Sequence, residues 1–229
     1  MRRTKADALI TRGRILDSAA ALFLRQGVAR TTLAHIAERA GVTRGAIYWH
    51  FEDKAALFNA MMERARTPLE SAMRLLDAPC SRDPLAALQE YARLVFVLTV
   101  SDSDARCVFE IATLKTEYVD DMRSVRDRWS EAALCWMAAA ESRVALAVAR
   151  GQARPEVEPR SVALGLWALI DGLVRSWMLA PDSFELVAIG GRIVGTHLDA
   201  IRACRPREQG RGRGAARAVS ARCRMEQEC

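Results

Sequence analysis

The sequence predicts an all-α protein with two domains. Ala, Leu, Arg and Val dominate the 229 residues, and only 13 Gly and 7 Pro interrupt them, a composition that favours helices over sheet. Apolar residues recur every three to four positions, which is the period of an amphipathic helix. This period is interrupted at Glu52 and Asp53 and is absent from the C-terminal segment. We therefore expect a small N-terminal domain over residues 1–54, a larger helical domain over 55–204 and a disordered basic tail over 205–229.

The first helix is expected to begin near Asp7 and to close at Gly27. Its apolar residues fall on one face at helical spacing: Ile15, Leu16, Ala19, Leu22 and Phe23. This face should pack against the next two helices, so that three helices share a small core.

The stretch 31–54 predicts two short helices joined by a very tight corner. Thr32 is a suitable N-cap for a helix from about Leu33, and Gly41 can adopt the left-handed conformation that ends it. Thr43 is a second N-cap, for a brief helix over residues 44–50. Small and apolar residues should face inward, namely Ile36, Ala37, Ala40, Val42 and Ile47. This is the layout of a helix-turn-helix that reads DNA.

The second helix of this pair exposes side chains suited to nucleic acid. Arg44, Tyr48 and His50 offer donors for phosphates and base edges, while small residues beside them allow close approach to a groove. The candidate DNA contacts are Thr32, Thr43, Arg44, Gly45, Ala46, Tyr48, Trp49, His50 and Lys54.

Core packing is the alternative interpretation for the aromatic residues of this helix. Two helices joined at a Gly corner occur in many all-helical proteins, and one helical turn needs a face to pack on its neighbour. On this ground Trp49 and Phe51 are expected to face the first helix, although Trp49 is kept among the candidate DNA contacts. DNA contact is favoured for Arg44 and Tyr48.

Six further helices are expected in the larger domain. Asp53 can cap the first of them, Asp83 and Pro84 provide an N-cap and first residue for the second, and Gly151 and Pro155 mark a loop. The expected helices cover residues 54–76, 85–100, 105–114, 117–150, 159–179 and 183–204.

The last two of these helices are apolar around much of their circumference. A domain of this size cannot easily bury all of that surface, so part of it should face a second copy of the chain. Gly191 and Gly195 lie four residues apart, where close helix approach would offset their cost of about 1 kcal/mol each. That approach can occur across a homodimer interface or within one chain.

These residues resemble those of a known family. The run GVTRGAIYWHFEDKAALF, preceded by ARTTLAHIAERA, is similar to the DNA-binding domain of TetR-family transcriptional regulators. The segments RRTKADA, VARTTLAHIA and IDGLVRSWMLAPDSFEL are similar to AcrR-like and TtgR-like repressors of multidrug efflux pumps, and the likeness extends to about Ala203. The resemblance implies a homodimer on palindromic double-stranded operator DNA, a four-helix dimer bundle from the last two helices, and a phosphate contact by Lys54.

A hydrophobic small-molecule effector is the expected ligand of the larger domain. Asp171 and Arg175 are one turn apart on an otherwise apolar helix, so they pair with each other, with backbone or with a ligand. The resemblance places both in the drug pocket, but Phe109 and Thr113 stand where those relatives carry Asn and His. Aromatic residues at helical spacing could also line a pocket or simply fill the core. The candidate ligand contacts are Phe96, Phe109, Thr113, Trp136, Trp167, Asp171 and Arg175.

The distribution of charge and apolar residues indicates which segments can attract DNA and where in the cell the protein is located. Basic and acidic residues number ten and five over residues 1–54, 17 and 20 over 55–204, and seven and three over 205–229. The excess of positive charge therefore coincides with the predicted DNA-binding unit and with the tail, which either adds sequence-independent attraction to DNA or is dispensable. The N-terminus lacks an apolar secretory segment, and charges interrupt the most apolar stretch, so we expect a cytoplasmic protein without a membrane span.

The sequence gives little support for catalysis, metal binding or cofactor binding. The chain has three His, no nucleophile motif, and six Cys without metal-site spacing, so no catalytic residue, metal or cofactor is expected. Cys107 and Cys135 are expected to be small apolar fillers.

The leading hypothesis is a dimeric repressor released from its operator by an apolar molecule. The alternatives are a repressor or activator of another operon, or a redox-responsive regulator that uses Cys107 or Cys135 as sensor.

Overall fold

The computed structural model describes residues 5–77, 83–118 and 122–203, without the side chains of residues 65–72 and 75–77. Throughout these ranges the fold is helical, and their only extended pairing is an isolated bridge between Ala153 and Arg202. The elements are α1 (Lys5–Gln26), α2 (Leu33–Ala40), α3 (Arg44–His50), α4 (Lys54–Asp77), α5 (Pro84–Ser101), α6 (Ser103–Leu114), α7 (Arg123–Ala149), α8 (Pro159–Leu179), η2 (Pro181–Ser183), η3 (Leu186–Gly190) and α9 (Gly191–Asp199). The predicted all-α class is confirmed, while the tail lies outside the described residues.

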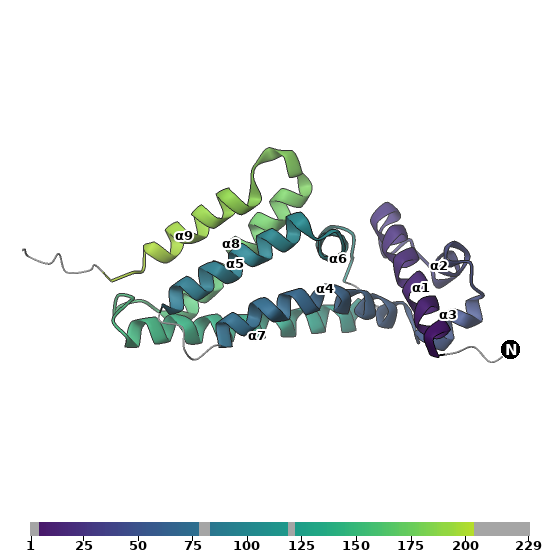
Figure 1. Cartoon of the computed structure of the whole chain (residues 1–229), viewed down its shortest axis with the longest axis horizontal. Helices are drawn as coiled ribbons and strands as arrows, with labels where there is room; N and C mark the ends of the chain where they lie inside the picture. Colours follow the sequence, from purple (N-terminus) through teal and green to yellow (C-terminus); the bar gives the residue numbers. More distant parts are fainter. Residues whose placement is uncertain (1–4, 78–82, 119–121, 204–229) are drawn as a thin grey trace, which may run out of the picture.

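Helices α1, α2 and α3 form a compact unit at one end of the molecule (Figure 1). The predicted stripe of α1 is confirmed, because all five of its residues are buried. The inward face predicted for α2 and α3 is confirmed as well, with Val42 only partly buried. This core does not stop at α3: Phe58 of α4 packs its ring 6.0 Å from that of Phe23, and the buried residues of α6 belong to the same cluster.

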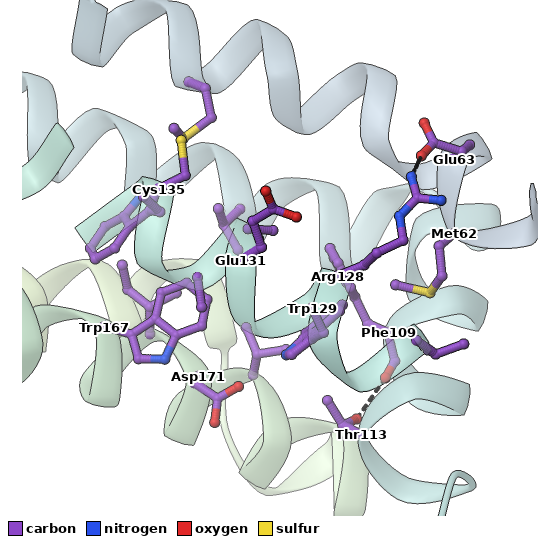
Figure 2. Close-up of a pocket in the computed structure, with 18 of the residues that line it drawn as sticks. Met62, Glu63, Phe109, Thr113, Arg128, Trp129, Glu131, Cys135, Trp167 and Asp171 are labelled. Carbon is purple, nitrogen blue, oxygen red and sulfur yellow. Dashed lines mark hydrogen bonds and ion pairs between the residues drawn. The ribbon is translucent and has the colours of Figure 1, made fainter. Parts of the chain in front are cut away.

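Helix α4 leaves this unit and runs beside α7 into the larger domain (Figure 1). There a second core gathers side chains from α5, α7, α8 and α9. Helix α5 contributes a buried face that extends from Leu88 to Thr99. Side chains of α4, α5, α6, α7 and α8 surround the cavity shown in Figure 2.

Two predicted helices have different bounds in the structure. The helix expected over 117–150 begins only at Arg123, and Tyr118 instead folds back to donate its hydroxyl to the Ala112 carbonyl at 2.6 Å. The helix expected over 183–204 is replaced at its start by the 3₁₀ turn η2 and the π-helical turn η3. At η3 the Phe96 ring approaches so closely that a Cβ on Gly190 would lie 2.8 Å from it. The π-helical turn at this point therefore goes together with close packing of Gly190 against α5.

Of the two glycines of α9 for which close approach was predicted, Gly195 shows it within one chain and Gly191 does not. A Cβ on Gly195 would lie 3.1 Å from the Gln89 side chain of α5, whereas Gly191 borders open space. Helix α8 makes a similar contact, where a Cβ on Gly165 would lie 3.2 Å from the His197 ring.

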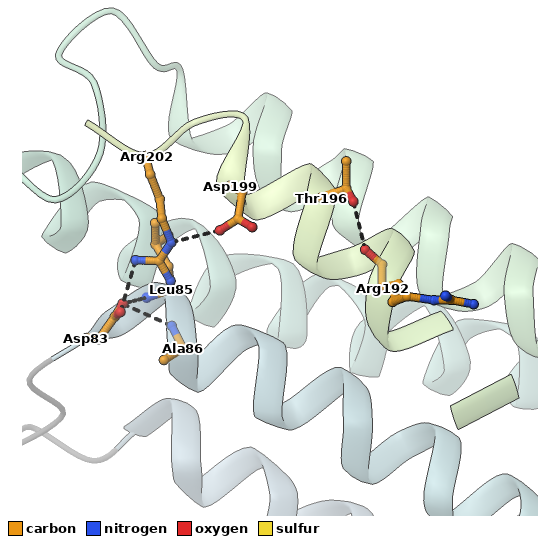
Figure 3. Close-up of polar contacts among 7 residues, drawn as sticks. All are labelled: Asp83, Leu85, Ala86, Arg192, Thr196, Asp199 and Arg202. Carbon is orange, nitrogen blue, oxygen red and sulfur yellow. Dashed lines mark hydrogen bonds and ion pairs between the residues drawn. The ribbon is translucent and has the colours of Figure 1, made fainter. Parts of the chain in front are cut away.

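The segment that directly follows α9 is tied to the start of α5 (Figure 3). Asp83 caps α5 by accepting the N–H groups of Leu85 and Ala86, both at 3.0 Å, and its second oxygen accepts Arg202 Nη1 at 3.0 Å. Arg202 also pairs with Asp199 at 3.1 Å. Partial burial raises the pKa of Asp83, but the hydrogen bonds from Ala86, Arg202 and Leu85 outweigh it, so the pKa lies below its ordinary value.

Two helices, α7 and α8, are long and apolar enough to cross a membrane by length and composition alone. Core helices of water-soluble proteins pass the same test, so this finding is weak evidence for a span.

Replacing Asp83 by Asn should destabilise the protein at neutral pH and much less in acid. We expect a loss of about 0.5 to 1 kcal/mol in the free energy of unfolding at pH 7, from the charge on the cap and its pair with Arg202, because Asn can still accept the cap hydrogen bonds and exposed ion pairs contribute little. Since the folded-state pKa is lowered, this contribution is complete above the ordinary value of 3.8 and is lost as pH falls through the lower folded value. Urea unfolding at pH 7 and pH 3, with the exposed Asp182→Asn as control, measures it; an Asp83→Asn deficit that persists at pH 3 would contradict it.

Candidate DNA-binding surface and ligand cavity

Both helices of the corner carry the caps that the sequence predicts. Thr32 Oγ1 accepts the His35 N–H at 3.2 Å, and the His35 ring in return accepts the Thr32 N–H at 3.4 Å, which closes a capping box. Gly41 ends α2 with a φ of 64°, and Thr43 caps α3 by accepting the Ala46 N–H at 3.2 Å. These caps hold α3 in place although it is only seven residues long.

The outer face of α3 presents an ordered pair of side chains. Arg44 Nη2 donates to the Tyr48 hydroxyl at 3.2 Å, and its guanidinium carbon lies 5.6 Å from the centroid of the Tyr48 ring. The hydrogen bond to Tyr48 raises the pKa of Arg44, so the guanidinium is charged at any pH of interest. Both residues are exposed, as are Thr43 and Gly45, while Ala46 and His50 are partly buried.

The orientation expected for Trp49 is wrong, whereas that of Phe51 is confirmed. Phe51 is 4% exposed and belongs to the core, with the Arg12 guanidinium 5.1 Å from its ring centroid. Trp49 is 72% exposed, because Ile47 and Phe51 already fill the inward face. Its ring instead meets the His50 ring edge-on, with centroids 4.5 Å apart.

Lys54 lies at a junction between three elements. Its Nζ donates to the Val28 carbonyl at 3.2 Å, and the Val28 N–H donates to the Lys115 carbonyl just after α6 at 3.0 Å. Asp53 caps α4 as predicted, accepting the Ala56 N–H at 2.6 Å. The ammonium of Lys54 retains two further donors, which is consistent with a phosphate contact.

The larger domain encloses a cavity of about 620 Å³, within the range of drug-sized ligand sites (Figure 2). Five of the seven candidate ligand residues line it, and they come from three helices: Phe109, Thr113, Trp136, Trp167 and Asp171. The Tyr91 and Trp136 rings lie 5.4 Å apart, as do those of Trp136 and Trp167, so three aromatic rings form a continuous wall. Burial raises the pKa of Tyr91, which keeps its phenol neutral.

Comparison with known proteins agrees with this arrangement. Residues 15–61 match the family of bacterial regulatory proteins of the tetR family, and residues 83–202 match the C-terminal region of MAATS-type transcriptional repressors. The regulator TtgR of Pseudomonas putida is 40% identical over 202 residues, which are 88% of this chain and 96% of TtgR. The chain belongs to the TetR family of transcriptional regulators.

Solved structures of TetR-family repressors share the fold. NalD, the secondary repressor of the MexAB-OprM multidrug efflux pump in Pseudomonas aeruginosa, superposes with a TM-score of 0.79 at 31% identity, covering 86% of this chain and 98% of NalD. SmeT of Stenotrophomonas maltophilia in complex with triclosan has a TM-score of 0.74 at 29% identity, covering 85% of this chain and 93% of SmeT. This TetR-family chain is therefore a DNA-binding transcriptional repressor, and the expectation that it is not an enzyme is confirmed by the family.

Two candidate ligand residues of the TetR-family chain lie away from the cavity. Phe96 is fully buried against Gly190 and belongs to the core. Arg175 is exposed, and its charge acts on Tyr118, where it partly opposes the rise in pKa that burial causes. Within the described residues Asp171 and Arg175 form no ion pair, so the spacing of one turn does not bring these two charges together.

Sequence reasoning found Trp136 of α7 but missed the contribution of the first half of that helix to the cavity. In that half, Arg128, Trp129 and Glu131 line the cavity, and Arg128 Nη2 pairs with Glu63 of α4 at 2.6 Å (Figure 2). A signal was present in the sequence, because Val125, Trp129, Ala132 and Trp136 recur every three to four residues.

Alanine at Trp49 and at Phe51 should affect stability very differently. We expect Trp49→Ala to change the free energy of unfolding by less than about 0.5 kcal/mol, as surface substitutions do, and Phe51→Ala to cost about 3 to 5 kcal/mol by opening a cavity. Urea unfolding of both variants measures this. Equal losses would show that Trp49 is part of the core.

Proposed function

We propose that the protein represses a multidrug efflux operon as a homodimer on a palindromic operator, and that a hydrophobic effector releases it. One observation carries this proposal: a helix-turn-helix and a drug-sized apolar cavity occur in one chain and share helix α4. NalD represses an efflux pump and SmeT binds triclosan, which supports the same pairing of functions here. A cytoplasmic location fits a protein that must reach DNA.

Arg44 is the proposed base-reading residue. It lies at the exposed start of α3, and Tyr48 holds its guanidinium. In a helix-turn-helix the N-terminal residues of the second helix contact base edges. We assign Thr32, Thr43, Tyr48, Trp49, His50 and Lys54 to the phosphate backbone, with Gly45 and Ala46 allowing close approach.

Dimerisation is proposed through α8 and α9. Leu164 and Leu179 of α8 are 56% and 68% exposed, and Ile193 of α9 is 38% exposed. Such apolar residues on adjacent helices suit a second copy of the chain better than water. A two-fold axis at this face would place two α3 helices on two half-sites, which requires a palindromic operator.

The proposed switch uses contacts between the cavity and the DNA-binding unit. Glu63 of α4 lines the cavity, and the next residue, Arg64, pairs with Asp17 and donates to the Gly13 carbonyl of α1 at 3.2 Å. A second route passes through α6, which provides Phe109 to the cavity wall. A ligand that displaces α4 or α6 would tilt the DNA-binding unit, because packed side chains do not compress.

The redox alternative is less favoured. Cys107 is half-buried against the core, and burial, followed by the charges of Asp104 and Glu110, raises the pKa of its thiol and so disfavours the reactive thiolate. Cys135 is exposed at the cavity, so its expected role as an apolar filler is wrong. Regulation of another operon remains the alternative function.

Alanine at Arg44 and at Lys54 should weaken operator binding in different ways. We expect Arg44→Ala to cost about 1 to 3 kcal/mol and to relax preference at one base position, whereas Lys54→Ala should weaken all sequences alike and lower the salt slope by about one unit. Binding titrations on operator variants at several salt concentrations measure both effects, with the distant Arg160→Ala as control. If both variants lose affinity uniformly and equally, Arg44 does not read bases.

Effector and operator should weaken each other's binding by the same factor. We expect about a 5- to 150-fold effect in each direction, because linkage requires reciprocity. Calorimetry with triclosan, with and without operator, tests this. Arg64→Met should retain the separate affinities for triclosan and for operator but lower the coupling between them by up to about fivefold, which is the contribution of an exposed ion pair. The control Arg93→Met on α5 should leave the coupling unchanged. Equal triclosan affinity with and without DNA would rule out the switch.

A further inference from the structure

The capping box at the start of α2 is closed by a histidine. Such boxes usually pair an N-cap Ser or Thr with Glu or Gln at the third helical position, and here His35 occupies that position after Thr32. The His35 N–H donates to Thr32 Oγ1 at 3.2 Å, and the Thr32 N–H donates to His35 Nδ1 at 3.4 Å. Glu would also interact favourably with the helix dipole, so the stability of α2 alone does not account for a histidine here.

The bond from the Thr32 N–H determines which nitrogen of the His35 ring carries the hydrogen. Because Nδ1 accepts this hydrogen bond, the neutral ring must carry its hydrogen on Nε2. The two ring nitrogens point in nearly opposite directions, which turns Nε2 away from the backbone of α2. His35 is exposed, and within the described residues Nε2 has no partner. The box therefore holds an unused N–H donor at the protein surface.

Thr32 leaves a second donor at the same place. Its Oγ1 accepts the His35 N–H, while its own hydroxyl hydrogen has no acceptor among the described residues. The first turn of α2 contains no acidic residue that could take either donor or repel an anion. His35 also lies opposite the buried face of the helix, which is formed by Ile36, Ala37 and Ala40. Both acceptors of the box are thus used inside it, and both side-chain donors remain for a ligand.

Phosphate oxygens of the DNA backbone are acceptors that suit this pair of donors. In a helix-turn-helix the first helix crosses the backbone while the second lies in the major groove, and α2 packs directly against α3 (Figure 1). A carboxylate in place of His35 would set a negative charge against the phosphates, whereas an imidazole N–H donates to them. A box closed by Glu would therefore cap α2 and repel DNA.

We infer that His35 is a further DNA-binding residue, whose Nε2–H donates to a backbone phosphate beside Thr32. This inference rests on the proposed function, because it extends the DNA-binding surface from α3 to the first turn of α2. A phosphate contact carries no sequence information, so His35 contributes to affinity and to the placing of α3 and not to the choice of bases.

The test compares three substitutions of His35 in the full chain, using fluorescence anisotropy with a duplex that the parent protein selects from a random-sequence pool. His35→Glu should lower duplex affinity at least about tenfold, because a donor to phosphate is replaced by a charge of the same sign. His35→Gln can close the box and still donate, so it should stay within about twofold of the parent. His35→Met can do neither and should bind roughly fivefold more weakly.

The control is Arg106→Gln, an exposed position on α6 outside the helix-turn-helix. It changes the net charge by the same amount as His35→Glu and should alter duplex affinity less than about twofold. Urea unfolding should show His35→Glu to be at least as stable as the parent, because Glu is a usual partner in a capping box. Nitrogen NMR at pH 8, where a histidine ring is neutral, should place the His35 hydrogen on Nε2, with only three His to assign.

A purely structural role for His35 makes the opposite prediction, since Glu would then bind the duplex as well as the parent does. That result, an equal loss in His35→Gln and His35→Glu, or a hydrogen on Nδ1 of His35 overturns the inference and leaves the proposed function standing. If the parent protein selects no duplex, the proposed function fails, and the inference with it.

Discussion

Helix α4 is packed into two environments at once, and the rest of the structure depends on this constraint. Leu57, Phe58 and Met61 are buried in the core that also holds α1, α2 and α3. Only two residues after Met61, Glu63 reaches Arg128 of α7 and lines the cavity. Close-packed side chains transmit displacement instead of absorbing it. The DNA-binding unit therefore cannot keep its orientation when the cavity wall beside α4 moves.

Local chemistry made the N-terminal unit predictable from sequence. Thr32, Gly41, Thr43 and Asp53 each act on the backbone within four residues, so their roles can be derived without knowing the tertiary fold. The predictions that failed depend on contacts between residues far apart in the sequence. In a helix of seven residues the period cannot decide whether Trp49 or Phe51 faces inward. The close contact between Gly190 in the π turn and Phe96 of α5 joins positions more than 90 residues apart, so the local sequence cannot show it.

The cavity was predictable in part, for a related reason. Asp171 and Trp167 stand out as a charge and a large ring on an apolar helix, and both line it. Glu131 and Arg128 do not stand out in the sequence, because charged residues on a helix are normally solvated. They line the cavity only because α4 and α8 lie beside this face of α7. Arg175 is the opposite error, because it was expected at the cavity and lies away from it. Spacing of one turn permits a contact with Asp171 but does not require it.

The energies involved suit a switch better than a rigid link. In the described part of the chain, the polar contacts between the DNA-binding unit and the rest include Arg64 with Asp17 and with the Gly13 carbonyl, Val28 with Lys115, and Lys54 with Val28. Each contributes only about 0.5 to 1.5 kcal/mol, so that two of them together match a typical allosteric coupling of about 1 to 3 kcal/mol. The apolar core around Phe23 and Phe58 is worth far more and need not open. A bound effector can therefore rearrange these contacts while the shared apolar core keeps α1, α2, α3 and the start of α4 together, so that they tilt as one body.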